Sequence, residues 1–302
     1  VKLTLQREEQ HDPFEVAISR ALIFNPTVEY EPQGSAAVIK LSSFNQSTSR
    51  NLTRAIEKAR REMGSELKGI VLDMRDNPGG LLDQAVQVSD LFLASGRIVS
   101  TRGRHPDSLQ VYDATGRDIT NGLPLVVLVN GQSASAAEIV AAALQDRGRA
   151  VVVGSNSFGK GTVQNISRMP NDGEMVLTWS RFHAPSGYPI ANLGVLPNVC
   201  TSLAGATTDN VLDAVNPMWF KTPVLLASWR HAALREENNS LRENCPRSKE
   251  SAEMDVIVAE RLIDDPTLYR RAMQQNGPTF AEPVLDTPAI VGASAARLPS
   301  FQ

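Results

Sequence analysis

Short apolar runs alternate with amphipathic segments through the middle of the chain. GIVLDM at 69–74 and PLVVLV at 124–129 are continuous apolar runs of strand length, and polar loops separate them from helical patterns at 81–94 and 134–146. Two further apolar runs, RIVST and AVVVG, follow these helices. Continuous apolar strands that alternate with helices are typical of a largely parallel sheet covered on both faces. The pattern therefore predicts an α/β core of repeated strand–helix units.

Upstream of these units, the pattern predicts three strands and one helix. Residues 1–23 alternate between apolar and polar positions around a central break, as expected of two strands. AAVIKL at 36–41 predicts a third strand. From Ser47 the apolar positions recur at helical spacing up to a stop at Gly64, which predicts an amphipathic helix.

Downstream of Gly161, alternation returns and predicts antiparallel hairpins with turns at NDG and APSG. Residues 217–276 have a mostly helical pattern, and sequence rich in Pro and Ala follows from Gly277. These changes divide the chain into four parts. We expect a short strand at 1–10, a core at 11–205, a mainly helical region at 206–276 and an extended or disordered tail at 277–302.

The composition is that of an ordinary globular protein. Of 302 residues, 42% are apolar and 21% are charged, and the length suggests roughly two domains. A net charge of −3 without a long basic block argues against nucleic acid as a partner. No run approaches the roughly 18 apolar residues of a membrane helix. The chain begins without Met and without a signal core, so we expect a soluble piece whose targeting segment lies outside it.

Candidate chemistry lies in loops that follow two of the predicted strands. In parallel sheets, sites form where loops leave the carboxyl ends of strands and free N–H groups begin the next helix. The loops at 75–80 and 130–135 have this placement. Ser135 opens a helix, where those N–H groups would stabilise a developing oxyanion, so it is a candidate nucleophile. A capping or packing serine is the alternative interpretation.

The last predicted strand of these units is followed by a candidate general base, Lys160, and by a residue that could support it, Gln164. Lys160 lies between two glycines, so the backbone can approach closely and bury the amine, and burial favours the neutral form that a general base needs. Gln164 points to the same side of the predicted strand and could hold the amine without adding charge. A solvated loop lysine and an exposed strand glutamine are the alternatives.

The run SASAAEI, the FGKG loop and the following VQ together resemble the C-terminal processing peptidases, also called tail-specific proteases. This is a Ser/Lys family on a ClpP/crotonase-like core. The resemblance implies that Ser135 is the nucleophile, that Lys160 is the general base, and that Gln164 orients the lysine. The oxyanion donors that it implies are the N–H groups of Ala136 and Gly80, with Gly79 as the less favoured alternative to Gly80.

The resemblance covers about residues 1–200. VKLTLQRE resembles the last strand of the family's PDZ domain, most of which the chain lacks, and GYPIANLGVLPNV resembles the motif that ends the core. The function implied is cleavage near the C-terminal region of protein or peptide substrates with accessible C-termini, without metal or cofactor. The setting implied is the bacterial envelope, specifically the periplasm, where an adaptor protein is a further partner to consider. Such an oxidising compartment would favour a disulfide between Cys200 and Cys245.

Two other enzyme classes fit the sequence less well. Residues 154–160 match the P-loop pattern G-x-x-x-x-G-K, but Gly161 replaces the Ser or Thr that reaches magnesium, and a strand pattern follows where a helix must begin. A Ser/His/Asp triad would have to draw on His183, the only histidine near the matched core motifs, and the chain lacks a G-x-S-x-G elbow at Ser135. We expect the charged residues beside the first loop, Asp73, Arg75 and Asp76, to fix that loop through ion pairs.

A non-enzymatic alternative is a catalytically silent peptidase-like core that serves as an assembly scaffold. The helical region carries an apolar stripe formed by Met254, Val258 and Leu262, and we expect a subunit contact in a homo-oligomer to cover it. The presence of Ser135, Lys160 and Gln164 argues against the scaffold, because a scaffold has no need for all three.

Overall fold

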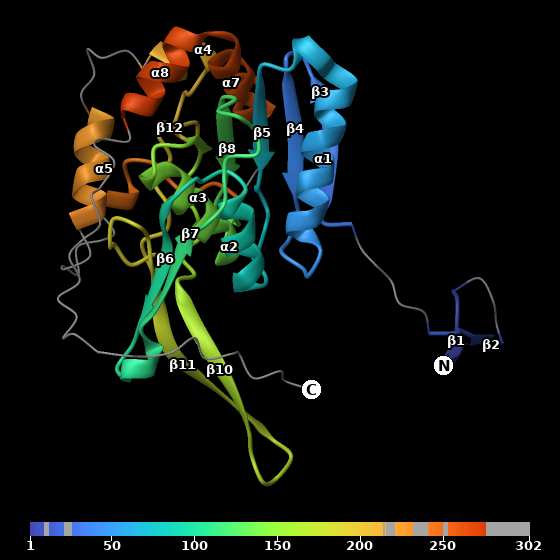
Figure 1. The fold of residues 1–302 in the computed structure, drawn as a ribbon. Helices are drawn as coiled ribbons and strands as arrows, with labels where there is room; N and C mark the ends of the chain where they lie inside the picture. The colour runs from blue at the N-terminus through green and yellow to red at the C-terminus, as the bar shows by residue number, and fades with distance from the viewer. Residues whose placement is uncertain are drawn as a thin grey trace.

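The computed structural model describes residues 1–8, 12–20, 26–213, 215, 221–231, 241–249 and 253–275. A six-stranded sheet in the order β12-β9-β8-β5-β4-β3 forms its centre (Figure 1). Only β3 and β4 pair antiparallel, and the other neighbours are parallel. The strands are β3 (Val28–Gln33), β4 (Ala36–Leu41), β5 (Gly69–Asp73), β8 (Leu125–Val129), β9 (Val151–Gly154) and β12 (Val199–Cys200).

Helices cover both faces of this sheet because its central strands are apolar on both sides. Leu72 and Val127 belong to one buried cluster, and their neighbours Val71 and Val126 belong to the other. The first cluster includes residues of α1 (Thr48–Met63), α2 (Leu82–Asp90), α3 (Ala136–Asp146) and α5 (Lys221–His231). The second includes residues of α4 (Thr208–Asp213), α7 (Glu253–Asp264) and α8 (Pro266–Gln274). The predicted α/β architecture is confirmed.

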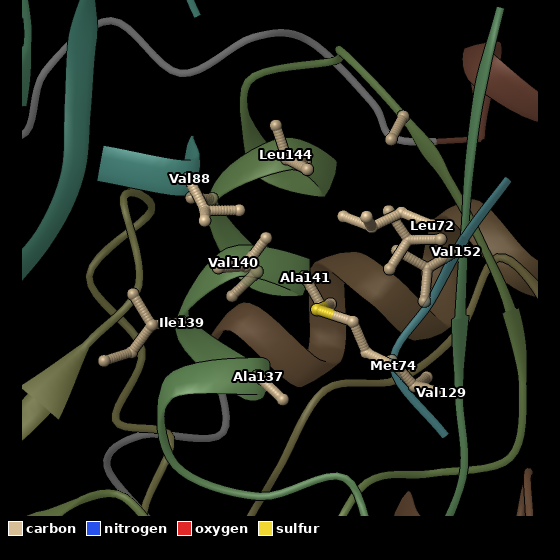
Figure 2. Packing of buried hydrophobic residues seen from close by; sticks show 14 of the residues in the cluster. Leu72, Met74, Val88, Val129, Ala137, Ile139, Val140, Ala141, Leu144 and Val152 are labelled. Atoms are coloured by element: carbon tan, nitrogen blue, oxygen red, sulfur yellow. The ribbon is translucent and has the colours of Figure 1, made fainter. Parts of the chain in front are cut away.

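Helix α3 is the central helix of the first layer. All its residues are buried, and Figure 2 shows it between Val88 of α2 and the sheet residues Leu72 and Val152. Its small side chains Ala137 and Ala141 leave room for Met74, which follows β5 directly. Because closely packed cores leave few side-chain rearrangements open, this packing fixes the position of the helix N-terminus.

A second sheet projects away from the rest of the structure in the long hairpin of β10 and β11 (Figure 1). Its order is β10-β11-β6-β7, and all its pairs are antiparallel. The β10–β11 hairpin agrees with the alternation after Gly161. The run RIVST does not lie in the parallel sheet as expected, because it forms β6 and pairs with β11 and β7. Its strands are β6 (Gly96–Arg102), β7 (Gln110–Ala114), β10 (Thr162–Arg168) and β11 (Glu174–His183). A separate N-terminal hairpin pairs β1 (Lys2–Leu5) with β2 (Phe14–Ala17), and two short 3-10 helices lie at Gly64–Glu66 and Pro106–Ser108.

The helical region departs from one expectation. Val258 and Leu262 of α7 are fully buried, and they pack with sheet residues such as Val71 and Val153 of this same chain. The prediction that a second subunit covers this stripe is therefore wrong. The break between α7 and α8 falls where Asp265 accepts hydrogen bonds at the start of α8. The tail at 277–302 lies outside the described residues.

Among the residues that the structure describes, no helix is both long and apolar enough to cross a membrane.

Candidate active site

The loops that follow β5 and β8 touch each other, as their places in the sheet predict. The Ala134 amide donates to the Asn77 carbonyl oxygen at 2.9 Å. Gly79 packs so tightly that a Cβ there would lie 2.8 Å from the Ser135 Cβ and 2.9 Å from the Ala136 nitrogen. The backbone of the first loop therefore lies directly against Ser135.

Asn77 organises the first loop from a fully buried position. Its Nδ2 donates to the Leu41 carbonyl at 2.7 Å, and its Oδ1 accepts from the Gly79 amide at 2.8 Å. Because Asn77 already occupies the Gly79 N–H, Gly80 is the better placed oxyanion donor of the two. A Cβ at Gly80 would lie 2.1 Å from the Phe44 carbonyl oxygen, so only glycine fits.

Ser135 is the N-cap residue of α3 and has a positive φ of 56°. This conformation is uncommon for residues other than glycine, and such positions cluster at functional sites. The Ser135 side chain is half-buried. Ala136 is the first residue of α3, so its N–H has no intrahelical acceptor. The candidate nucleophile therefore lies beside an amide without an intrahelical acceptor, at a buried helix start.

Glu138 joins the start of α3 to the loop that carries Lys160. Its side chain is fully buried, and its Oε2 accepts from the amides of Ser135 at 2.8 Å and of Lys160 at 2.9 Å. Its Oε1 accepts from the Ser157 hydroxyl at 2.5 Å and from the Gly159 amide at 2.6 Å. One carboxylate thus fixes the backbones of both candidate catalytic residues.

Burial raises the pKa of the Glu138 carboxyl, and the hydrogen bonds from Ser157, Gly159, Ser135 and Lys160 oppose that rise. Glu138 was not among the residues predicted for the site. A signal was nevertheless present, because residues 135–138 read S-x-x-E, the capping-box pattern in which the glutamate reaches back to the N-cap amide.

The Lys160 loop follows the expectation only in its backbone. A Cβ at Gly161 would lie 2.1 Å from the Ala191 nitrogen, and the Gly159 carbonyl accepts from the Asn192 amide at 2.9 Å. The two glycines thus allow close backbone approach, as predicted. The Lys160 side chain is nevertheless exposed, so burial of the amine within the chain is a prediction that the structure does not bear out.

Gln164 is exposed near the start of the β10–β11 hairpin. The expectation that it shares one strand face with Lys160 assumed regular alternation along β10. The register of β10 against β11 shifts between Val163 and Gln164, and a β-bulge of this kind re-aims the side chains that follow it. The orienting role of Gln164 stays a prediction.

Charged residues brace the first loop, partly as predicted. Arg75 pairs with Asp73 at 2.6 Å and with Asp255 of α7 at 3.1 Å, and all three side chains are largely buried. The Asp76 Oδ1 accepts from the Asn130 side chain at 2.8 Å and from the Gln132 side chain at 3.0 Å. Helix α7 thereby contributes a carboxylate that supports the loop from outside the core units.

The geometry excludes the P-loop interpretation and weakens the Ser/His/Asp one. Strand β10, not a helix, follows residues 154–160. Burial lowers the pKa of His183, and the neighbouring cations Arg102 and Arg181 lower it further. In the described part of the chain, no carboxylate is hydrogen-bonded to His183, so the partner that orients a triad histidine is missing there.

The family model described as peptidase family S41 matches residues 35–201, which include every candidate site residue. The chain belongs to peptidase family S41. Among curated S41 relatives, the carboxy-terminal-processing protease of Bartonella bacilliformis is 42% identical over 200 residues, which cover 66% of this chain and 46% of that protein. A probable CtpA-like serine protease of Staphylococcus aureus is 35% identical over 201 residues, covering 66% of this chain and 39% of that one.

One solved structure agrees with this assignment in fold. The photosystem II D1 C-terminal processing protease superposes with a TM-score of 0.50 at 26% identity, covering 61% of this chain and 50% of that one. The chain therefore spans about half the length or less of the S41 relatives that it matches.

Proposed function

We propose that this chain is the catalytic part of a serine peptidase that cleaves protein substrates near their C-terminal region. In this proposal Ser135 is the nucleophile, Lys160 is the general base, and Gln164 orients the lysine. The observation that carries the proposal is the shared acceptor: one oxygen of Glu138 binds the amides of both Ser135 and Lys160. Two residues that act together in catalysis must be held in a fixed relative position. A buried carboxylate that binds both backbones holds them in this way.

The reaction is an acyl transfer in two halves. Lys160 takes the proton from the Ser135 hydroxyl as its oxygen attacks the substrate carbonyl. The oxyanion accepts hydrogen bonds from the N–H groups of Gly80 and Ala136, and the α3 dipole adds to this stabilisation. Lys160 then gives the proton to the leaving amine, and water hydrolyses the acyl-enzyme by the same steps.

Substrate binding completes the surroundings of the base. The loop backbone around Lys160 is fixed by Glu138, and the Lys160 side chain is exposed. A substrate chain laid across the site would exclude water from the amine. The surroundings of the base would therefore be complete only when substrate is present.

The substrates that we propose are proteins with accessible C-termini, as the names of the relatives suggest. The compartment that we propose is the periplasm or cell envelope. The disulfide between Cys200 and Cys245 supports an oxidising location, since such bonds persist outside the reducing cytosol.

A serine-directed acylating probe tests the proposal against the silent scaffold. We expect the wild-type chain to be labelled at Ser135 and to cleave unstructured peptides, and Ser135→Ala to do neither. Ser65→Ala, which alters an exposed serine of the 3-10 helix Gly64–Glu66, is the matched control and should behave as wild type. An unlabelled, inactive wild-type chain would support the scaffold.

A further inference from the structure

A segment far along the chain lies against both loops of the candidate site. We call residues 241–249 the strap. The disulfide between Cys245 and Cys200 attaches the strap to the end of β12, and the Cys245 side chain is buried. The Ser202 hydroxyl adds a bond to the Pro246 carbonyl at 2.5 Å. The strap lies beyond residue 201, where the match to the S41 family model ends.

Arg242 of the strap binds both sides of the Lys160 loop. Its guanidinium donates to the Asn192 carbonyl at 2.6 Å and to the Ser157 carbonyl at 2.9 Å. Asn192 in turn donates its amide to the Gly159 carbonyl. Arg242 therefore ties the segment before Lys160 to the turn that packs behind it.

Arg247 of the strap binds the Lys160 loop at Phe158, the residue after Ser157. Its guanidinium donates to the Phe158 carbonyl and lies over the Phe158 ring at 4.6 Å from the centroid. Phe158 is itself 47% exposed, so its ring is accessible to this contact. The loop is thus held through a main-chain oxygen and through a side chain.

The strap also reaches the loop that leads to Ser135. The Gly131 amide donates to the Ser248 carbonyl at 2.6 Å, and the Ser248 amide donates to the Ser155 hydroxyl at 3.1 Å. A Cβ at Gly131 would lie 2.1 Å from the Arg247 Cγ, so glycine is needed for this approach. One segment therefore contacts the backbone that leads to the nucleophile and the backbone that leads to the base.

The backbone of residues 157–160 binds an anion through its amides and cations through its carbonyls. The amides of Gly159 and Lys160 point to the Glu138 carboxylate, whereas the carbonyls of Ser157 and Phe158 point to cations of the strap. Charged partners make the stronger hydrogen bonds, and here both polarities of one short peptide stretch have them. Glu138 binds amides of the loop, and the strap supplies donors to the carbonyls of Ser157 and Phe158.

We propose that Arg242 and Arg247 are positioning residues for Lys160, and that the Cys200–Cys245 disulfide keeps them in place. This inference rests on the proposed function of Lys160 as the base. Its consequence is that peptidase activity depends on the oxidised bridge. A dithiol reductant delivers two electrons and two protons to the bridge, leaving two cysteine thiols while the reductant closes to its own disulfide. The strap is then attached only by its non-covalent contacts.

Steady-state cleavage of a fluorogenic peptide by the full chain tests the positioning role. We expect Arg242→Ala to lower kcat about 10- to 100-fold with KM changed less than about threefold, because the base is misplaced while the substrate surface stays intact. Arg242→Lys should recover part of kcat, since one charge can reach one carbonyl but cannot bridge two. Arg54→Ala, on an exposed face of α1, is the matched control and should behave as wild type.

The bridge is tested by treatment with dithiothreitol and by the double variant Cys200→Ser/Cys245→Ser. We expect both to lower kcat as Arg242→Ala does, and the double variant to be indifferent to reductant. Unchanged kcat in Arg242→Ala and Arg247→Ala, or after complete reduction verified by thiol alkylation, would overturn the proposal.

Amide hydrogen exchange separates this inference from the proposed function. We expect the Gly159 and Lys160 amides to exchange at least about tenfold faster in Arg242→Ala than in wild type, with the core of α3 unchanged. This result would support the positioning role of the strap even for a wild-type chain that cleaves nothing. Equal exchange of these two amides in both proteins would overturn that role, whatever the activity of the wild type.

Discussion

Ser135 and Lys160 share one hydrogen-bond acceptor, because their backbone amides donate to the same carboxylate oxygen at 2.8 and 2.9 Å. They lie 25 positions apart in sequence, and a helix and a strand intervene. The acceptor is Glu138, whose other oxygen binds the loop just before Lys160. The relation between nucleophile and base is therefore set by main-chain atoms around one buried anion, and it can be disturbed without touching either side chain.

Glu138→Gln should lower both stability and activity. Glutamine keeps one acceptor oxygen but replaces the other with an NH₂ group, so two of the four donors lose their acceptor. Buried unsatisfied donors cost about 1–3 kcal/mol each, and we expect the free energy of unfolding to fall by at least about 2 kcal/mol. Urea unfolding and peptide cleavage measure the two effects. Glu57→Gln, on the exposed side of α1, should change neither, and an equally stable Glu138→Gln would contradict the structure.

The raised pKa of Glu138 also predicts a pH dependence of stability. Because burial raises this pKa above its ordinary value of 4.5, the native state holds the proton to higher pH than the unfolded chain does. The stabilisation from the neutral form is complete below the unfolded pKa and is lost as the pH rises through the raised one. The difference in unfolding free energy between wild type and Glu138→Gln should therefore be larger at pH 4 than at pH 8. A difference that is constant across this range would contradict the assignment.

Gly79 allows a direct test of the close approach between the two loops. Gly79→Ala brings two costs, a positive φ of 100° and a Cβ only 2.8 Å from the Ser135 Cβ. Gly187 has a similar φ of 93° but open space around its Cβ position, so Gly187→Ala isolates the backbone cost of about 1–2 kcal/mol. We expect peptide cleavage to fall at least tenfold in Gly79→Ala and to stay near wild type in Gly187→Ala. Equal activity of the two variants would show that the contact is unimportant.

The sequence predicts the parts of this molecule that depend on local patterns. Continuous apolar runs gave the central strands, and topology alone brought the loops of Asn77 and Ser135 together, because carboxyl ends of parallel strands share one edge. The capping-box spacing also allows a prediction that Glu138 binds the Ser135 amide. The contact of Glu138 with Lys160 could not be predicted, because it depends on where a loop distant in sequence packs.

Contacts of the strap lack any local signal. Arg242 and Ser157 are far apart in sequence, and Arg242 belongs to a short polar segment without periodicity. The exposure of Lys160 was missed for a related reason, since flanking glycines show that a backbone can approach closely but not which way the side chain turns. The subunit contact expected of Val258 failed because this chain's own sheet covers that face.

Peptide cleavage should depend on pH and on the residue at position 164. A lysine acts as a base only when neutral, so kcat/KM should rise with pH. Lys160→Arg, which stays charged, should be inactive at every accessible pH. Gln164→Glu would stabilise the ammonium form and move the rising limb to higher pH, whereas Gln164→Ala should lower kcat without such a shift.

Parallel pH profiles of wild type, Gln164→Glu and Asn165→Asp make the comparison. Asn165 is the next residue of the exposed strand, so Asn165→Asp adds the same charge at a position that faces the other side of β10. A shift confined to Gln164→Glu would place residue 164 beside the base despite the register shift that precedes it. Identical shifts in both variants would show a general effect of the added charge. Superimposable profiles would show that Gln164 does not contact the base. An active Lys160→Arg would exclude the Ser/Lys mechanism.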